Sequence, residues 1–167
     1  CFQRSAMIGE KYGFYNNLSD TYIALTELYI QMGDIENAKK TGEKALTYAE
    51  LLENDFMVVR SLLSLGKLKN EEGDFASAIN YLKRSILTAT DGFGDMYYLS
   101  LIYQELSRAY EGQNNIIESF KAYKLYHELT RRVFNTEADQ RITQLQTEME
   151  VSQKESTISL QMAKLKR

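Results

Sequence analysis

Proline and tryptophan are absent from the 167-residue sequence, and glycine occurs only nine times. Proline breaks helices and, together with glycine, marks the frequent turns of β-rich folds. Their scarcity leaves long stretches in which a helix can continue without interruption. The sequence therefore predicts an all-α fold, long enough for one domain with a buried core and an appendage.

Cysteine and histidine each occur once, as Cys1 and His127. One cysteine forms neither an internal disulfide nor a cysteine metal cluster, and one histidine gives no metal-binding pair and no triad with Cys1. The segment DGFGD at 91–95 lacks the ending of a phosphate loop and the alternating ligands of a calcium loop, so it is predicted to connect two units. We predict a chain that is not an enzyme and has no cofactor and no metal.

Positive charge is not in excess, since 20 Lys and Arg face 23 Asp and Glu and the pI is near 5.3. Such a chain has no overall basic field, which disfavours nucleic acid as the main partner. The most apolar stretch, 96–103, is far shorter than the roughly 18 to 20 residues of a membrane span, so none is predicted. The compartment is undetermined, with the cytoplasm favoured over a periplasmic sensor region. The chain starts without methionine and ends inside a helical pattern, which predicts a piece of a longer protein.

An internal repeat runs through the chain. The segment LTELYIQMGD at 25–34 reappears as LGKLKNEEGD at 65–74 and as LSRAYEGQNN at 106–115, at offsets of 40 and 41. A second pattern follows each segment at the same offsets: Ile35, Ala38 and Ala45; Phe75, Ala78 and Ser85; Ile116, Ser119 and Tyr126. A fixed period of this length indicates a repeat architecture of three units.

This pattern of large residues, Leu-Gly, Gly-Asp and Ala positions resembles a long variant of the tetratricopeptide repeat. The resemblance implies an α-solenoid of helix-turn-helix repeats followed by a long C-terminal helix. It divides the chain into a repeat array at 1–134, with a partial unit at 1–15 and units at about 16–55, 56–95 and 96–134, and a connector at 135–167. Residues 2–14 are predicted to form the second helix of a preceding unit.

Local physical chemistry supports the repeat independently. In the first helix, Leu25, Leu28, Tyr29 and Met32 follow spacings of three and four, so they are predicted to form one core-facing side. Gly33, Gly73 and Asn114 stand where a helix must end in a left-handed residue before a tight reversal. Ala38 and Ala78 are predicted to lie where the two helices of a hairpin cross most closely. Lys69 departs from the pattern, and its stem is expected to pack while its ammonium reaches water.

The resemblance also implies a concave groove lined by the first helix of each unit. Its positions carry over as Asp20, Ile23, Glu27 and Ile30, then Arg60, Leu63, Lys67 and Asn70, then Leu101, Gln104, Arg108 and Glu111. We hypothesise that the three cations among them contact acidic groups of a partner, with an ordinary solvated surface as the alternative. The carboxylate clamp of chaperone-binding members is not matched, because Ile23, Glu27, Ser64, Leu101 and Glu105 occupy its positions.

The last 33 residues follow a different pattern. Asn135 and Thr136, followed by Asp139, predict a helix N-cap and hence a kink or break. Beyond it, Ala138, Ile142, Leu145 and Met149 form a seam at coiled-coil spacing, and a shifted apolar stripe begins at Val151. The interpretations are a helical connector, a coiled coil that forms a parallel homodimer through this seam, and a solvated or partly disordered tail. The stretch from Tyr126, above all ITQLQTEME at 142–150, resembles the junction that precedes a histidine kinase or a diguanylate cyclase in bacterial signalling proteins.

These observations predict a module that binds a protein or peptide, as the sensory or scaffolding part of a larger bacterial signal-transduction protein. The alternative is a regulatory domain that senses a small ligand or a signal peptide and changes its superhelical pitch on binding.

Overall fold

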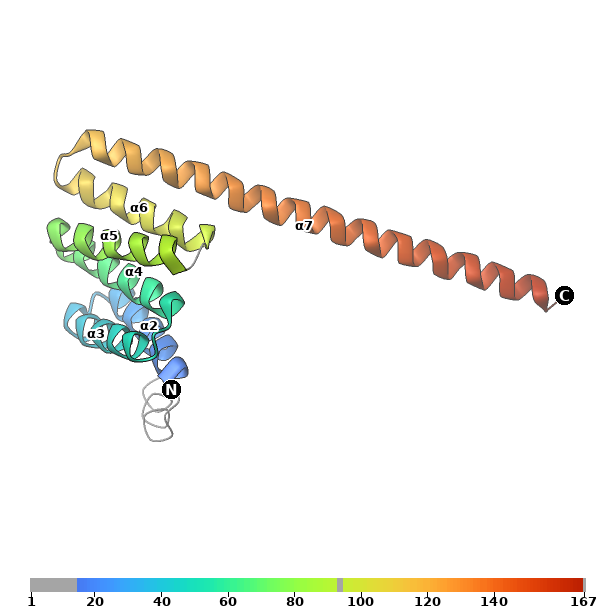
Figure 1. The fold of residues 1–167 in the computed structure, drawn as a ribbon, viewed down its shortest axis with the longest axis horizontal. Helices are drawn as coiled ribbons and strands as arrows, with labels where there is room; N and C mark the ends of the chain where they lie inside the picture. Colours follow the sequence, from blue (N-terminus) through green and yellow to red (C-terminus); the bar gives the residue numbers. More distant parts are fainter. Residues whose placement is uncertain (1–14, 93–94, 167) are drawn as a thin grey trace. The chain divides into compact units, whose positions relative to one another are not determined.

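The structure is a computed structural model that describes residues 15–92 and 95–166. Every element in these ranges is a helix, as Figure 1 shows. The helices are α2 (Tyr15–Met32), α3 (Ile35–Leu51), α4 (Asp55–Glu72), α5 (Phe75–Gly92), α6 (Met96–Gly112) and α7 (Ile116–Leu165). The predicted all-α fold of helix-turn-helix repeats with a long C-terminal helix is confirmed. The expected helix at 2–14 lies outside the described residues.

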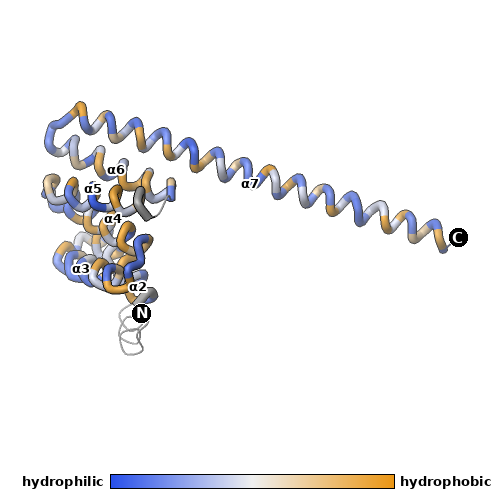
Figure 2. Tube along the Cα trace, viewed as in Figure 1, coloured by the Kyte–Doolittle hydropathy of each residue, from blue (hydrophilic) through white to orange (hydrophobic). Residues whose placement is uncertain are grey.

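The chain divides into two units, Cys1–Thr130 and Arg131–Arg167, which are described separately. In the first unit, α2 pairs with α3 and α4 with α5, and α4 also packs against α3 and α2. Apolar residues recur at intervals along each helix (Figure 2), as expected for helices that bury one side. None of the helices within 15–92 and 95–166 is both long and apolar enough to cross a membrane.

The turns between paired helices combine a left-handed residue with a side-chain cap. Gly33, Gly73 and Asn114 have φ of 77°, 78° and 59°, as predicted. Asp74 then accepts a hydrogen bond from the backbone N–H of Ser77 at 3.2 Å, and the bonds from Ser77 lower the pKa of this carboxyl group. Asp34 and Asn115 cap the following helices in the same way. The repeated pairing of left-handed residue and cap explains why the period is visible in the sequence.

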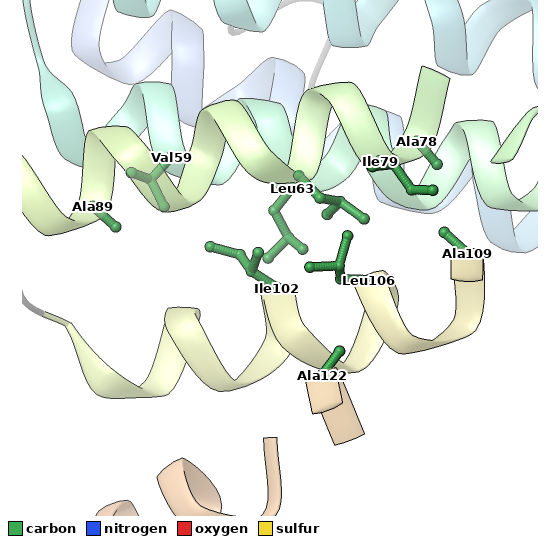
Figure 3. Packing of buried hydrophobic residues seen from close by; sticks show 10 residues of the cluster. Val59, Leu63, Ala78, Ile79, Ala89, Ile102, Leu106, Ala109 and Ala122 are labelled. Atoms are coloured by element: carbon green, nitrogen blue, oxygen red, sulfur yellow. The ribbon is translucent and has the colours of Figure 1, made fainter. Parts of the chain in front are cut away.

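The largest core cluster joins α4, α5, α6 and the start of α7. Figure 3 shows Val59 and Leu63 of α4 and Ile79 of α5 facing Ile102 and Leu106 of α6. Small residues allow the helices to approach closely. The clearest cases are Ala78, Ala109 and Ala122, which are 0%, 0% and 4% exposed. Ser107 and Ser119 add hydroxyl-to-carbonyl hydrogen bonds of 3.0 and 2.9 Å between α6 and α7.

Part of the predicted core of α2 is wrong. Leu25 is buried, but Leu28 and Met32 are 41% and 67% exposed. Leu68, the residue of α4 that corresponds to Leu28, is fully buried in a cluster with Ala38 of the preceding hairpin. The repeat position shared by Leu28 and Leu68 is therefore covered in the middle repeat, where the hairpin α2–α3 packs against it.

The surroundings of Lys69 in the middle repeat differ from the prediction. The Lys69 side chain is only 15% exposed, and its ammonium donates a hydrogen bond to a Glu72 carboxylate oxygen at 2.8 Å. This bond raises the pKa of Lys69, against the opposing effect of burial.

The predicted helix break near Asn135 is also wrong, because α7 continues through it to Leu165. The Thr136 hydroxyl does not cap a new helix and instead donates to the carbonyl oxygen of Arg132 at 2.9 Å. Asn and Thr lower helix propensity by less than about 1 kcal/mol each, so a sequence that looks like a cap can lie inside a helix.

Candidate partner-binding site

The first helices of successive units lie side by side, so that equivalent residues face each other. The guanidinium of Arg60 on α4 bonds the carboxylate of Asp20 on α2 at 2.7 Å. Seven residues further along both helices, the Lys67 ammonium lies 3.5 Å from the Glu27 carboxylate. Both pairs join residues exactly one 40-residue period apart. The same period that defines the repeat therefore also places opposite charges next to each other.

A pocket of about 180 Å³ lies between these two ion pairs. It is lined by Ile23 and Glu27 of α2, by Arg60, Leu63 and Lys67 of α4, and by Tyr97, Tyr98 and Leu101 of α6. Six of these eight residues belong to the groove predicted from the sequence. Ile23 and Leu63 are only 2% and 3% exposed, so they provide an apolar floor. The structure thus brings half of the predicted groove together in one cavity that three units share.

Arg60 is held on several sides. Its guanidinium lies 5.5 Å from the ring centre of Phe56 and 5.9 Å from that of Tyr98, in addition to its bond to Asp20. Tyr98 makes edge contacts with Phe56 and with Tyr97. Cation–π contacts of this kind hold a guanidinium in place. Arg60 is therefore a wall of the pocket and not a freely moving side chain.

The other end of the groove is more acidic. The buried Asn70 amide donates to the backbone carbonyl and the carboxylate of Glu105 at 3.0 and 2.9 Å, which makes Asn70 a link between units. Arg108 lies between Glu71 and Glu105, at 2.9 and 3.7 Å. Glu111 is exposed in the last turn of α6. Two carboxylates thus pair with one guanidinium here, and a third carboxylate is exposed one turn further along α6.

The remaining predicted positions lie outside the pocket. Ile30 is half-buried against the cluster of Ala38 and Leu65. Gln104 is exposed, and its amide lies 3.4 Å from the hydroxyl of Tyr126.

The three cations of the predicted groove have carboxylate partners within the chain. Arg60, Lys67 and Arg108 are each paired with a carboxylate of a neighbouring unit. Around them the groove contains five carboxylates: Asp20, Glu27, Glu71, Glu105 and Glu111. The net charge of the groove is therefore negative. Sequence reasoning missed this because a position in a helix does not specify which neighbour a long side chain will contact.

Sequence reasoning also missed Tyr97 and Tyr98. A signal was present, because these residues follow Phe56 and Met57 at the offset of 41, in the first turn of the helix. Aromatic side chains at this position add wall area to the pocket, whereas the usual groove positions begin one turn later.

We expect Arg60→Glu to lower the free energy of unfolding of the repeat array by about 1 kcal/mol, because it replaces a partly exposed ion pair with two facing carboxylates. Urea unfolding followed by circular dichroism measures this. Adding Asp20→Arg should restore part of the loss, whereas Glu36→Arg on the exposed face of α3 should restore none. Equal rescue by both second substitutions would contradict the cross-unit pair.

Comparison with protein families identifies two of the hairpins. The tetratricopeptide repeat profile matches 20–50 and 59–89. These two segments are tetratricopeptide repeats. They correspond to the hairpins α2–α3 and α4–α5 and contain the first two of the three groove helices. Comparison with curated proteins finds no match.

The predicted dimer seam lies in the part of the chain from Arg131 to Arg167. Ile142, Leu145 and Met149 are 54%, 50% and 63% exposed, and every side chain from Asp139 to Lys166 is exposed. Ala138 at the start of the seam is half-buried. The described residues of the chain contain no group of three or more His, Cys, Asp or Glu side chains arranged to hold a metal ion.

Proposed function

We propose that this chain binds a protein or peptide in the groove formed by α2, α4 and α6 and performs no catalysis itself. Tetratricopeptide repeats generally mediate protein–protein interaction. The observation that carries the proposal is the pocket to which three successive units contribute, with an apolar floor and charged rims. A pocket with a few placed polar groups around apolar side chains is the usual form of a binding site.

Selection of peptides from a random display library on the intact chain tests this proposal. A selected peptide should bind Leu101→Gln at least about tenfold more weakly, because loss of an apolar contact in a pocket typically has this effect. Leu51→Gln provides the control, since Leu51 is 68% exposed at the end of α3. Equal affinity for both variants would place the binding site elsewhere.

We further propose that the module is the sensory or scaffolding part of a bacterial signal-transduction protein, with the repeats at 1–134 and a connector at 135–167. Support comes from the resemblance of residues 142–150 to the junction that precedes kinase or cyclase domains. The cytoplasm remains the favoured compartment.

A change of superhelical pitch on ligand binding is the second candidate function. One observation favours it: three ion pairs, Asp20–Arg60, Glu27–Lys67 and Glu71–Arg108, connect successive units across the groove. A ligand that displaced one partner would weaken the link between two units. Small-angle scattering with and without a selected peptide measures the pitch, and identical curves would leave only the static binding module.

We also propose that Ala138, Ile142, Leu145 and Met149 pair with the same residues of a second copy. A helical segment whose side chains are all exposed, as they are from Asp139 to Lys166, gains stability by burying an apolar seam in a coiled coil. We expect sedimentation equilibrium to show dimers that dissociate when Ile142 and Leu145 are both replaced by Glu. Glu at Gln140 and Thr147 adds equal charge to the opposite side of the helix and should leave the dimers intact. A wild-type chain that stays monomeric at high micromolar concentration would support the solvated tail.

A further inference from the structure

The pocket between the two ion pairs has a size that restricts its occupant. Its volume of about 180 Å³ is below the roughly 300 to 1,000 Å³ of sites for whole cofactors or drug-sized ligands. A cavity of about 150 Å³ is enough for a benzene molecule. The space between Ile23, Leu63 and Leu101 therefore accommodates one large apolar side chain, of the size of phenylalanine or leucine.

The rims of the pocket disfavour a charged side chain at this point. Arg60 and Lys67 are each neutralised by a carboxylate of α2. A charged group entering between them would have to compete with an existing ion pair and lose its own hydration. An uncharged apolar side chain incurs neither cost, and it removes its own apolar surface from water.

The acidic end of the groove specifies the second feature of the occupant. Glu71 and Glu105 both lie within ion-pair distance of Arg108, and Glu111 is exposed one turn further along α6, so three carboxylates and one groove cation lie at this end. The helices α4 and α6 also end here, at Glu72 and Gly112, and helix C-termini attract positive charge. A basic side chain is the complementary group for this end.

The two features are separated by a distance that a short peptide spans. From Leu101, helix α6 rises roughly 6 Å to Glu105 and roughly 15 Å to Glu111, at 1.5 Å per residue. An extended peptide advances about 3.3 Å per residue, so about two residues reach Glu105 and about four or five reach Glu111.

We propose that the groove binds an extended protein segment with a phenylalanine- or leucine-sized side chain in the pocket and a lysine or arginine about four or five residues away, at Glu111. This inference deepens the proposed function and rests on it. It replaces the acidic partner expected from the sequence with a basic one.

NMR titration of the intact chain with three capped hexapeptides, GFGGKK, GSGGKK and GFGGEE, tests the inference. Each peptide is also used in reversed order, because the groove does not fix the chain direction. GFGGKK or its reverse should shift the resonances of Leu63 and Leu101. GSGGKK should bind at least about tenfold more weakly, because it lacks the apolar anchor. GFGGEE should bind several-fold more weakly, and the difference should shrink in high salt.

Protein variants assign each effect to its place in the groove. Tyr97→Ala removes a half-exposed wall of the pocket and should weaken GFGGKK several-fold, whereas Tyr123→Ala, at an aromatic position on α7 with similar exposure, should not. Glu111→Lys should also weaken GFGGKK several-fold, while the same change at Glu43 on α3 should have no effect.

The outcomes separate the inference from the proposed function. If GFGGEE binds as tightly as GFGGKK, or GSGGKK as tightly as either, the basic or the apolar requirement is overturned while peptide binding in the groove stands. If library selection also yields no peptide that depends on Leu101, the proposed function itself is contradicted.

Discussion

Replacement of Leu82 by alanine is expected to lower the free energy of unfolding by about 2 to 5 kcal/mol, because it leaves a cavity in a close-packed core. Leu82 is fully buried on α5 and belongs to the cluster that joins four helices. Chemical denaturation of the full chain measures the change. A loss below about 1 kcal/mol would contradict the packing of α4 against α5.

The glycine that faces Leu82 makes this test sharper. A Cβ added to Gly66 would lie 2.6 Å from Cδ2 and 2.8 Å from Cγ of Leu82, so the leucine would have to move. Gly66→Ala should therefore destabilise the wild type by about 1 to 3 kcal/mol, although alanine has a higher helix propensity. In the Leu82→Ala background the same change should stabilise by up to about 1 kcal/mol, since only the propensity remains.

The control for this reversal of sign is a distant cavity. Leu18 on α2 is also fully buried, but it belongs to a different cluster. In the Leu18→Ala background, Gly66→Ala should remain destabilising. The same sign in both backgrounds would show that Gly66 and Leu82 are not neighbours.

Overpacking of the hairpins is the second large effect. Ala38 and Ala78 are 0% exposed at equivalent positions of α3 and α5. Leucine at either position should cost about 1 to 3 kcal/mol, because the added atoms force the paired helices apart. Thermal unfolding measures the shift, and Ala76→Leu, at an exposed position two residues before Ala78, should be close to neutral. Unchanged melting temperatures for both buried substitutions would contradict the repeat register.

The sequence predicted the features that depend on local chemistry. Gly33, Gly73 and Asn114 were identifiable because few residues tolerate a left-handed turn, and the groove positions followed from the period. The false helix break at Asn135 shows the limit of such rules. A cap needs a helix end, and the local pattern alone does not reveal whether the helix ends.

The contacts between units could be predicted only in part. Asp20 and Arg60 are one period apart and have opposite charges, so their pairing was open to inference. Arg108 bonds Glu71, which is 37 residues away, because the residue one period of 41 earlier is Lys67 and has the same charge. The choice between neighbours of a long side chain depends on the offset between stacked helices. This offset is set by the packing of the buried residues and is not encoded at the position itself.

We propose that the face formed by α2, α4 and α6 binds the partner. The most direct measurement is a chemical-shift map of the intact chain with a peptide selected from a library. We expect the largest shifts at Ile23, Leu63 and Leu101, with further shifts at Tyr97 and Tyr98. Shifts centred on the exposed faces of α3 and α5, with the pocket unchanged, would contradict it.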